Sequence, residues 1–249
     1  MMDAATMFYC CDNNLNCTDA FQGRSVMLSG GMVYNISENF SFTIPECEKL
    51  FIDSGGFQAT ATWDMSFPYE PRRLYEWAES IDADYVAMPD FACEPELHET
   101  SVMHRVARTV EEHAYAQYQY DEGDYSFELI PVLQGYYPEQ YEECVRMFEQ
   151  EGLIRDYMAI GTVCKRDSVD AIHNVVESIE QLLPNTEFHM FGMTLNAWKD
   201  RRMWGRFRSA DTAAWNWGAN TTEEKKQLLK EYSAKVDAIR NQMTAQTTL

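Results

Sequence analysis

The stretch that decides the fold is Phe51-Ile52-Asp53-Ser54-Gly55-Gly56-Phe57-Gln58. An apolar segment ends in an aspartate and a serine, and two glycines, an aromatic residue and an amide follow. Adjacent glycines allow the backbone to approach a flat ligand closely. In barrels of alternating strands and helices, catalytic groups lie where a strand passes into a loop, so we predict that Asp53 is catalytic. The same residues also fit a plain glycine turn beside a helix-capping aspartate.

Short apolar strands alternate with amphipathic helices on both sides of this stretch. We predict strands at Ser25–Leu28, Leu50–Asp53, Tyr85–Pro89, Glu128–Leu133, Tyr157–Val163, Glu187–Met193 and Arg206–Ala210. We predict helices at Pro71–Ile81, Pro95–Tyr120, Pro138–Gly152, Ser168–Leu183 and residues 221–245. Alternation of this kind implies a parallel sheet. Seven or eight such units in 249 residues favour an α/β fold of the (β/α)8 TIM-barrel type.

The chain length suits one domain over residues 1–249. Within it, we expect residues 1–24 to form an irregular segment at the rim or at the bottom of the barrel. Four histidines fall in predicted helices and are expected at the surface: His98, His104, His113 and His173.

Composition restricts the setting of the protein. Seven cysteines, an odd number, favour reduced thiols in a cytoplasm, or in a host cytoplasm for a viral protein, over a disulfide framework. No apolar run approaches the roughly 20 residues that span a membrane, so no membrane partner is expected. The N-terminus lacks the features of a signal peptide. A net charge of −20 argues against a nucleic-acid partner.

One segment opposes that charge argument. Five basic residues lie within ten positions: Lys199, Arg201, Arg202, Arg206 and Arg208. Trp198 and Trp204 are interleaved with them. Basic residues mixed with aromatic ones are typical of surfaces that follow a nucleic-acid backbone and stack on bases. The alternative is a solvated loop that two buried tryptophans anchor.

Residues that follow the strands of a barrel share one face of it. Here they are Asp53, Ser54, Phe57, Gln58, Asp90, Gln134, Gly135, Gly161, Thr162, Phe191, Gly192 and Asp211. Two carboxylates can divide a glycosidic displacement into a nucleophilic and a proton-transfer role. A third carboxylate and an amide can read the donors and the acceptor on a guanine edge. Phe57 and Phe191 can enclose a flat ring between them.

Six blocks in order resemble the tRNA-guanine transglycosylase superfamily. They are Phe51–Gln58, Met88-Pro89-Asp90, Val132-Leu133-Gln134-Gly135, Ala159-Ile160-Gly161, His189-Met190-Phe191-Gly192 and Ser209-Ala210-Asp211-Thr212. The resemblance runs from about residue 50 to about residue 216 and implies a base-exchange enzyme on a TIM barrel. It implies that Asp211 attacks C1′ and forms a covalent glycosyl intermediate, and that Asp53 handles the proton at N9.

The same resemblance assigns the binding groups. It implies that Asp90, Gln134 and the backbone around Gly161 and Thr162 read the base. Phe57 and Phe191 would then stack on it, and Ser54, Gln58, Gly135 and Gly192 would complete the pocket. Lys199, Arg201, Arg202, Arg206 and Arg208 would hold the nucleic-acid backbone beside Asp211. The incoming base in this superfamily is a free 7-deazaguanine.

One departure from the tRNA enzymes bears on the polymer. Those enzymes carry a zinc site of cysteines and a histidine after the nucleophile, but here no cysteine follows Cys164 and no histidine follows His189. The chain is therefore more similar to a zinc-free branch from phages and archaeal viruses that inserts 7-deazaguanines into DNA. We expect DNA as the partner, with tRNA as the alternative, and no metal or cofactor.

Other questions stay open at this point. The stretch Thr162–Lys165 departs from the tRNA pattern, so the choice between preQ0, preQ1 and another deazaguanine is undecided, and a homodimer is left open. Two further alternatives are a non-catalytic barrel that only binds nucleic acid and an unrelated glycoside hydrolase.

Overall fold

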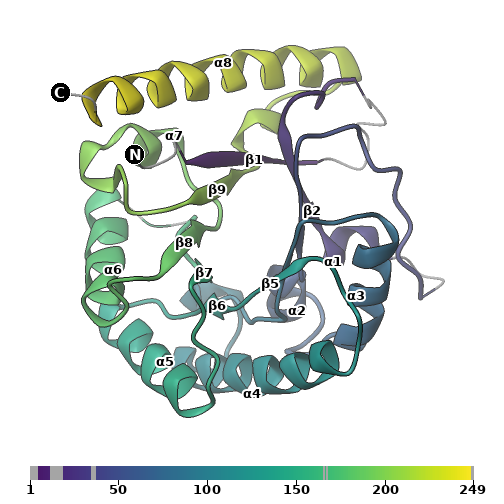
Figure 1. Cartoon of the computed structure of the whole chain (residues 1–249), viewed down its shortest axis with the longest axis vertical. Coiled ribbons are helices and arrows are strands. Elements are labelled where there is room, and N and C mark those ends of the chain that lie inside the picture. The colour runs from purple at the N-terminus through teal and green to yellow at the C-terminus, as the bar shows by residue number, and fades with distance from the viewer. Residues whose placement is uncertain (1–4, 12–18, 35–37, 165, 167, 248–249) are drawn as a thin grey trace.

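The computed structural model describes residues 5–11, 19–34, 38–164, 166 and 168–247, with side chains up to residue 244. Nine parallel strands form one sheet in the order β5-β4-β3-β2-β1-β9-β8-β7-β6 (Figure 1). They are β1 Thr6–Cys10, β2 Ser25–Ser29, β3 Leu50–Asp53, β4 Tyr85–Ala87, β5 Glu128–Ile130, β6 Val132–Leu133, β7 Tyr157–Ile160, β8 Glu187–Met190 and β9 Ser209–Thr212. The predicted α/β barrel is confirmed, and the protein is one domain.

Pro131 explains why nine strands make an eight-position barrel. Proline has no backbone N–H, so it interrupts the strand predicted over Glu128–Leu133. The first half, β5, pairs with β4, and the second half, β6, pairs with β7. The carbonyl oxygen of Pro131 still accepts a hydrogen bond from the Ala159 N–H at 2.7 Å. This one segment therefore brings the two ends of the sheet together.

His113 secures this closing segment. The Val132 N–H donates to His113 Nε2 at 2.8 Å, and His113 Nδ1 lies 2.7 Å from the Thr109 carbonyl oxygen. The side chain is fully buried, and burial lowers the pKa of His113 to about 3. The prediction of a surface position is therefore wrong for His113, because its helix turns this residue toward the barrel.

The N-terminal segment is also corrected. Thr6–Cys10 is a regular strand, β1, which pairs with β2 on one side and β9 on the other. Met7, Phe8 and Tyr9 are all buried, because a central barrel strand is covered on both faces. A short, continuously apolar run lacks the alternation that identifies a strand. Within the rest of the expected irregular segment, residues 1–4 and 12–18 lie outside the described residues.

The helices surround the barrel (Figure 1). They are α1 Gly30–Val33, α2 Gly56–Ala61, α3 Pro71–Ser80, α4 Val102–Asp121, α5 Pro138–Gln150, α6 Val169–Leu182, α7 Leu195–Lys199 and α8 Thr222–Thr247, with 3-10 turns at Pro95–Leu97, Arg201–Met203 and Ala214–Asn216. The helix predicted over Pro95–Tyr120 is divided: α4 begins only at Val102, where the Ser101 hydroxyl caps it. No helix in the described part of the chain could cross a membrane.

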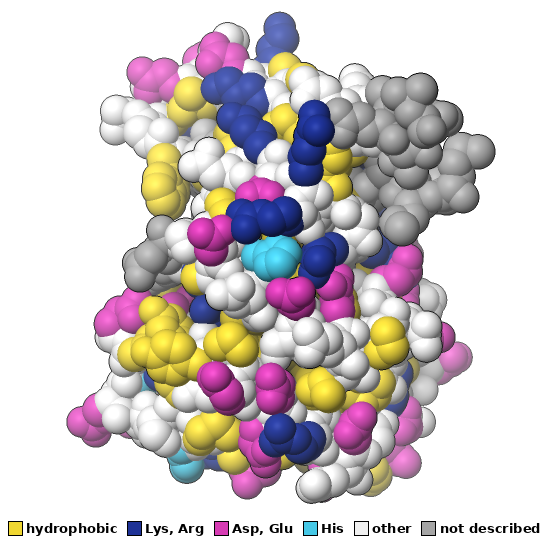
Figure 2. Space-filling view, turned by 90° about the vertical axis from the view of Figure 1, so that its left-hand side faces the viewer, with side chains coloured by type: hydrophobic (Ala, Val, Ile, Leu, Met, Phe, Trp, Pro, Cys, Tyr) yellow, Lys and Arg dark blue, Asp and Glu magenta, His cyan; other side chains and the backbone are white. Residues whose placement is uncertain are grey.

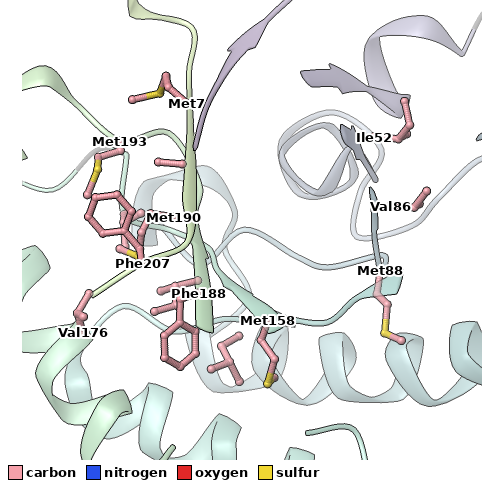
Figure 3. Packing of buried hydrophobic residues seen from close by; sticks show 14 of the residues in the cluster. Met7, Ile52, Val86, Met88, Met158, Val176, Phe188, Met190, Met193 and Phe207 are labelled. Atoms are coloured by element: carbon pink, nitrogen blue, oxygen red, sulfur yellow. The ribbon is translucent and has the colours of Figure 1, made fainter. Parts of the chain in front are cut away.

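Apolar packing occurs in two layers. Outward-facing strand residues such as Ile52, Met158 and Met190 pack beneath the helices (Figure 3). Inward-facing residues such as Phe8 and Phe51 fill the barrel interior. Because side chains alternate along a strand, the next inward positions toward the carboxyl ends are polar. This alternation places the candidate site at the C-terminal mouth.

Candidate active site

Asp211 lies on β9 and is 5% exposed. Its Oδ1 accepts a hydrogen bond from the Gly192 N–H at 2.7 Å, and its Oδ2 lies 3.1 Å from Cys10 Sγ. Burial and the charge of Asp211 raise the pKa of the Cys10 thiol well above its ordinary value, so Cys10 donates as a neutral thiol. Two donors therefore orient the carboxylate. The sequence pattern did not identify Cys10, because β1 itself was missed.

A row of buried polar side chains continues from Asp211 into the barrel. His189 Nε2 lies 3.4 Å from Asp211 Oδ1, within ion-pair distance. On the other side of the ring, His189 Nδ1 lies 2.6 Å from Ser209 Oγ, and Ser209 Oγ lies 2.6 Å from the Tyr157 hydroxyl. All three side chains of this row are buried. His189 thus lies against the carboxylate and is held from behind by Ser209.

Asp53 ends β3 at the same mouth and is partly exposed. Burial raises the pKa of Asp53 to about 6, and the charge of Asp211 adds to the increase. The Ser29 hydroxyl and the backbone N–H groups of Ser54 and Gly55 oppose it. A carboxyl group with this pKa can give or accept a proton near neutral pH.

A third carboxyl group, that of Asp90, forms a hydrogen-bonded network beside Asp53. Asp90 accepts hydrogen bonds from Ser54 Oγ, at 3.0 Å, and from Gln134 Nε2. The Thr162 hydroxyl donates to Gln134 Oε1 at 2.7 Å. Burial raises the pKa of Asp90 to about 7, and the Asp53 charge contributes. These side chains come from the ends of β3, β4, β6 and β7, so the structure brings together what the sequence placed about 110 residues apart (53 to 162).

An added side chain would collide with this network at two glycine positions. A Cβ on Gly56 would lie 2.6 Å from Asp90 Oδ1, and a Cβ on Gly161 would lie 2.2 Å from Gln134 Nε2. Both distances are far below van der Waals contact, so any larger residue would displace a polar side chain. The carbonyl of Gly161 also accepts a hydrogen bond from the Tyr141 hydroxyl at 2.7 Å.

The remaining predicted pocket residues lie around the same mouth. Phe57 begins α2 and is 45% exposed, while Phe191 follows β8 with its ring centroid 6.0 Å from that of Phe51. Gln58 packs close to Gly31, and Gly135 packs against Tyr141. Gly192 adopts a φ of +70° next to Cys164. Lys165, in the stretch that left the incoming base undecided, lies outside the described residues.

The predicted backbone-binding stretch does not gather beside Asp211. The Arg208 guanidinium lies 4.2 Å from the Tyr157 ring centroid and 3.2 Å from the Glu187 carboxylate. Tyr157 and Glu187 are the first residues of β7 and β8, so Arg208 lies at the opposite, N-terminal end of the barrel. Three residues of strand separate it from Asp211 by roughly 10 Å.

Other members of this stretch are engaged on the outer side. Arg206 pairs with Glu180 at 2.6 Å, and Arg202 pairs with Asp200 at 2.7 Å and with Asp170 at 2.8 Å. Lys199 and Arg201 are exposed. Trp198 is fully buried, so the alternative of a buried tryptophan anchor is confirmed for this residue. On the face that carries α6 and α7, acidic side chains lie among and below the basic ones (Figure 2).

Comparison with known proteins decides the family. The family model described as DpdA, DeoxyPurine in DNA protein A, matches residues 39–227, more than half of the chain. The chain belongs to the DpdA family. This is a tRNA-guanine transglycosylase-like family for 7-deazaguanine modification of DNA, which confirms the resemblance seen in the six sequence blocks. No curated protein matches the chain.

Membership in the DpdA family supports a role in DNA modification by transglycosylation and implies DNA as the substrate. The matched region contains Asp53, Asp90 and Asp211, while Cys10 and Ser29 precede it. Among the described residues, no group of three or more His, Cys, Asp and Glu side chains is arranged to hold a metal ion.

Proposed function

We propose that this protein exchanges guanine in DNA for a free 7-deazaguanine through a covalent intermediate on Asp211, without cutting the strand. The observation that carries the proposal is the pairing of an oriented carboxylate, Asp211, with a second carboxyl group, Asp53, whose pKa is about 6, at one mouth of the barrel. Two carboxyl groups with different environments are what a double displacement at a sugar carbon requires.

In the first half-reaction, an Asp211 oxygen attacks C1′, and the bond between C1′ and N9 breaks. The leaving guanine takes the bonding electrons at N9, and protonated Asp53 supplies the proton. In the second half-reaction, the Asp53 carboxylate removes the N9 proton of the incoming 7-deazaguanine. N9 then attacks C1′, and the Asp211 ester bond breaks. The phosphodiester backbone takes no part, so the strand stays uncut and carries the new base, while Asp211 and Asp53 return to their starting states.

The network around Asp90 suits the recognition of guanine. Each oxygen of a carboxylate can accept more than one hydrogen bond, so Asp90 can accept from the N1–H and N2–H₂ groups while Ser54 remains bound. Gln134 Nε2 keeps a second N–H beside the Asp90 contact, and this N–H and the Thr162 backbone N–H can donate to O6, whereas the Gly161 N–H already donates to the Leu133 carbonyl oxygen. Phe57 and Phe191 can pack against the faces of the ring. These roles are proposals that rest on position and chemistry.

The experiment is an exchange assay with radiolabelled guanine and three polymers: duplex DNA, single-stranded DNA and bulk tRNA. We expect label in DNA and none in tRNA. We also expect Asp211→Asn to abolish both exchange and the covalent protein–DNA adduct that denaturing gels detect, with Asp211→Asn folding checked by thermal unfolding. Label in tRNA alone would assign the chain to the tRNA reaction. No label in any polymer, with no adduct, would favour a non-catalytic binding barrel.

A further inference from the structure

Large apolar side chains are exposed unevenly over the molecule. Seven are more than 40% exposed among the described residues: Met32, Phe57, Tyr115, Tyr118, Tyr137, Leu182 and Trp217. Two of them lie on α4 and one ends α6, on the outer surface. The other four lie on segments that directly follow β2, β3, β6 and β9. All four therefore lie on the C-terminal side of the barrel, the same side as Asp53 and Asp211.

Three of these four residues are aromatic, and we call Phe57, Tyr137 and Trp217 the aromatic rim. Their exposed fractions are 45%, 59% and 81%. Tyr137 is in edge contact with Tyr136, with ring centroids 5.1 Å apart, and the Arg166 guanidinium lies 5.2 Å from the Tyr136 centroid. Exposed aromatic rings at a catalytic mouth are available to pack against a bound ring.

The charge distribution disfavours DNA binding that depends mainly on contacts to phosphate groups. The chain carries a net charge of −20, which repels a polyanion. Arg202, Arg206 and Arg208 are paired with acidic residues, and Arg208 lies at the far end of the barrel. Since these charges weaken phosphate contacts, DNA binding at this mouth gains from contacts other than charge. Stacking of bases on aromatic rings is such a contact, and it tolerates any sequence.

We propose that the aromatic rim binds the nucleotides that flank the target base as an unpaired, single-stranded segment of DNA. The inference deepens the proposed function, since it takes from it that the target base enters the mouth beside Asp211. A base in an intact duplex presents no free face to a ring, whereas an unpaired base presents two. The reacting C1′–N9 bond is also reached only when the base leaves the stack. Phe57, Tyr137 and Trp217 each follow a different barrel strand at this mouth, so neighbouring bases can stack on them.

The test measures binding separately from chemistry. Fluorescence anisotropy of a labelled oligonucleotide that contains one guanine would be recorded in the Asp211→Asn background, as a single strand and as a duplex. We expect tighter binding of the single strand, and an affinity loss of roughly 5- to 100-fold in Tyr137→Ala and in Trp217→Ala. Trp217→Phe should retain most of the affinity. Tyr118→Ala is the matched control, since Tyr118 is 60% exposed but lies on α4.

The outcomes separate the two proposals. The proposal that the aromatic rim binds single-stranded DNA would be overturned by either of two results. One is single-strand affinity within twofold of the parent in both alanine variants, and the other is equal affinity of the parent for duplex and single strand. If the parent chain exchanges no guanine but the alanine variants still lose single-strand affinity, the proposed chemistry is wrong and the proposed role of the aromatic rim in binding is supported. Quenching of Trp217 fluorescence by the single strand, absent in Trp217→Phe, would support direct stacking. Unfolding temperatures equal to the parent's would exclude misfolding.

Discussion

His189 Nε2 lies 3.4 Å from Asp211 Oδ1, while the other ring nitrogen of His189 lies 2.6 Å from Ser209 Oγ. A hydroxyl group has one proton to donate. If the Tyr157 hydroxyl donates to Ser209, then Ser209 donates to His189 Nδ1, and the ring proton resides on Nε2, facing Asp211. In that arrangement, the buried chain of Tyr157, Ser209 and His189 presents an N–H to the carboxylate that we propose as the nucleophile.

We therefore expect His189→Phe to slow single-turnover guanine release roughly 10- to 100-fold, since the 3.4 Å contact can tighten into a hydrogen bond to the carboxylate during the reaction. Phenylalanine keeps the ring among Phe8, Phe51 and Phe191, so the unfolding temperature should change little. Ser209→Ala should slow guanine release less, because the His189 ring stays in place and only its tautomer is no longer fixed by Ser209. Release within twofold of the parent in His189→Phe would contradict the positioning role.

The raised pKa of Asp53 predicts a pH dependence for base release. Release uses the protonated carboxyl group, so its single-turnover rate should fall as pH rises through about 6, the pKa that burial gives Asp53. Asp53→Asn should lower exchange roughly 100- to 10,000-fold and remove this limb of the profile. Full exchange activity in Asp53→Asn would contradict the assignment of Asp53 as the general acid and base.

Gly161→Ala should damage recognition of the free base more than the chemistry. The added methyl group would lie 2.2 Å from Gln134 Nε2 and would displace the amide that donates to Asp90. We expect the KM for the incoming 7-deazaguanine to rise roughly 5- to 100-fold, since overpacking costs about 1–3 kcal/mol. Steady-state kinetics with saturating DNA would measure it. A change confined to kcat would place Gly161 outside base recognition.

His113 predicts how stability depends on pH. Its pKa in the folded protein is about 3, below the ordinary 6.5, because burial disfavours the charged ring. The unfolded chain therefore binds the proton first, and the free energy of unfolding falls as pH drops below about 6.5. The contribution is up to about 1.4 kcal/mol per pH unit until the folded pKa is reached.

Asp53 and Asp90 act in the opposite direction, since their raised pKa values let the folded protein take up protons as pH falls. Comparison with His113→Gln cancels their effect. From pH 6.5 to 4, the parent should lose about 3 kcal/mol more than this variant in urea unfolding. Parallel pH profiles would show that His113 is protonated in the folded state or already neutral in the unfolded chain.

Local patterns determined a large part of this protein. The alternation of strands and helices depends on side-chain period and on turn residues, which neighbours in the sequence settle. The prolines that begin α3 and α5 and the serine that caps α6 are signals of this kind. Because every strand of a parallel barrel points the same way, the residues after each strand were also predictable as neighbours in space, as Asp53, Asp90 and Gln134 are.

Tertiary structure decided the rest. β1 is a strand because β2 and β9 enclose it, and that pairing alone brings Cys10 to Asp211. His113 is buried because α4 packs against the closing segment at Pro131. Arg208 is only three residues from Asp211 along the chain, yet the strand between them carries the two to opposite ends of the barrel. Distance along the chain determines which residues are close in sequence. The direction and the pairing partners of each strand determine at which end of the barrel a residue lies.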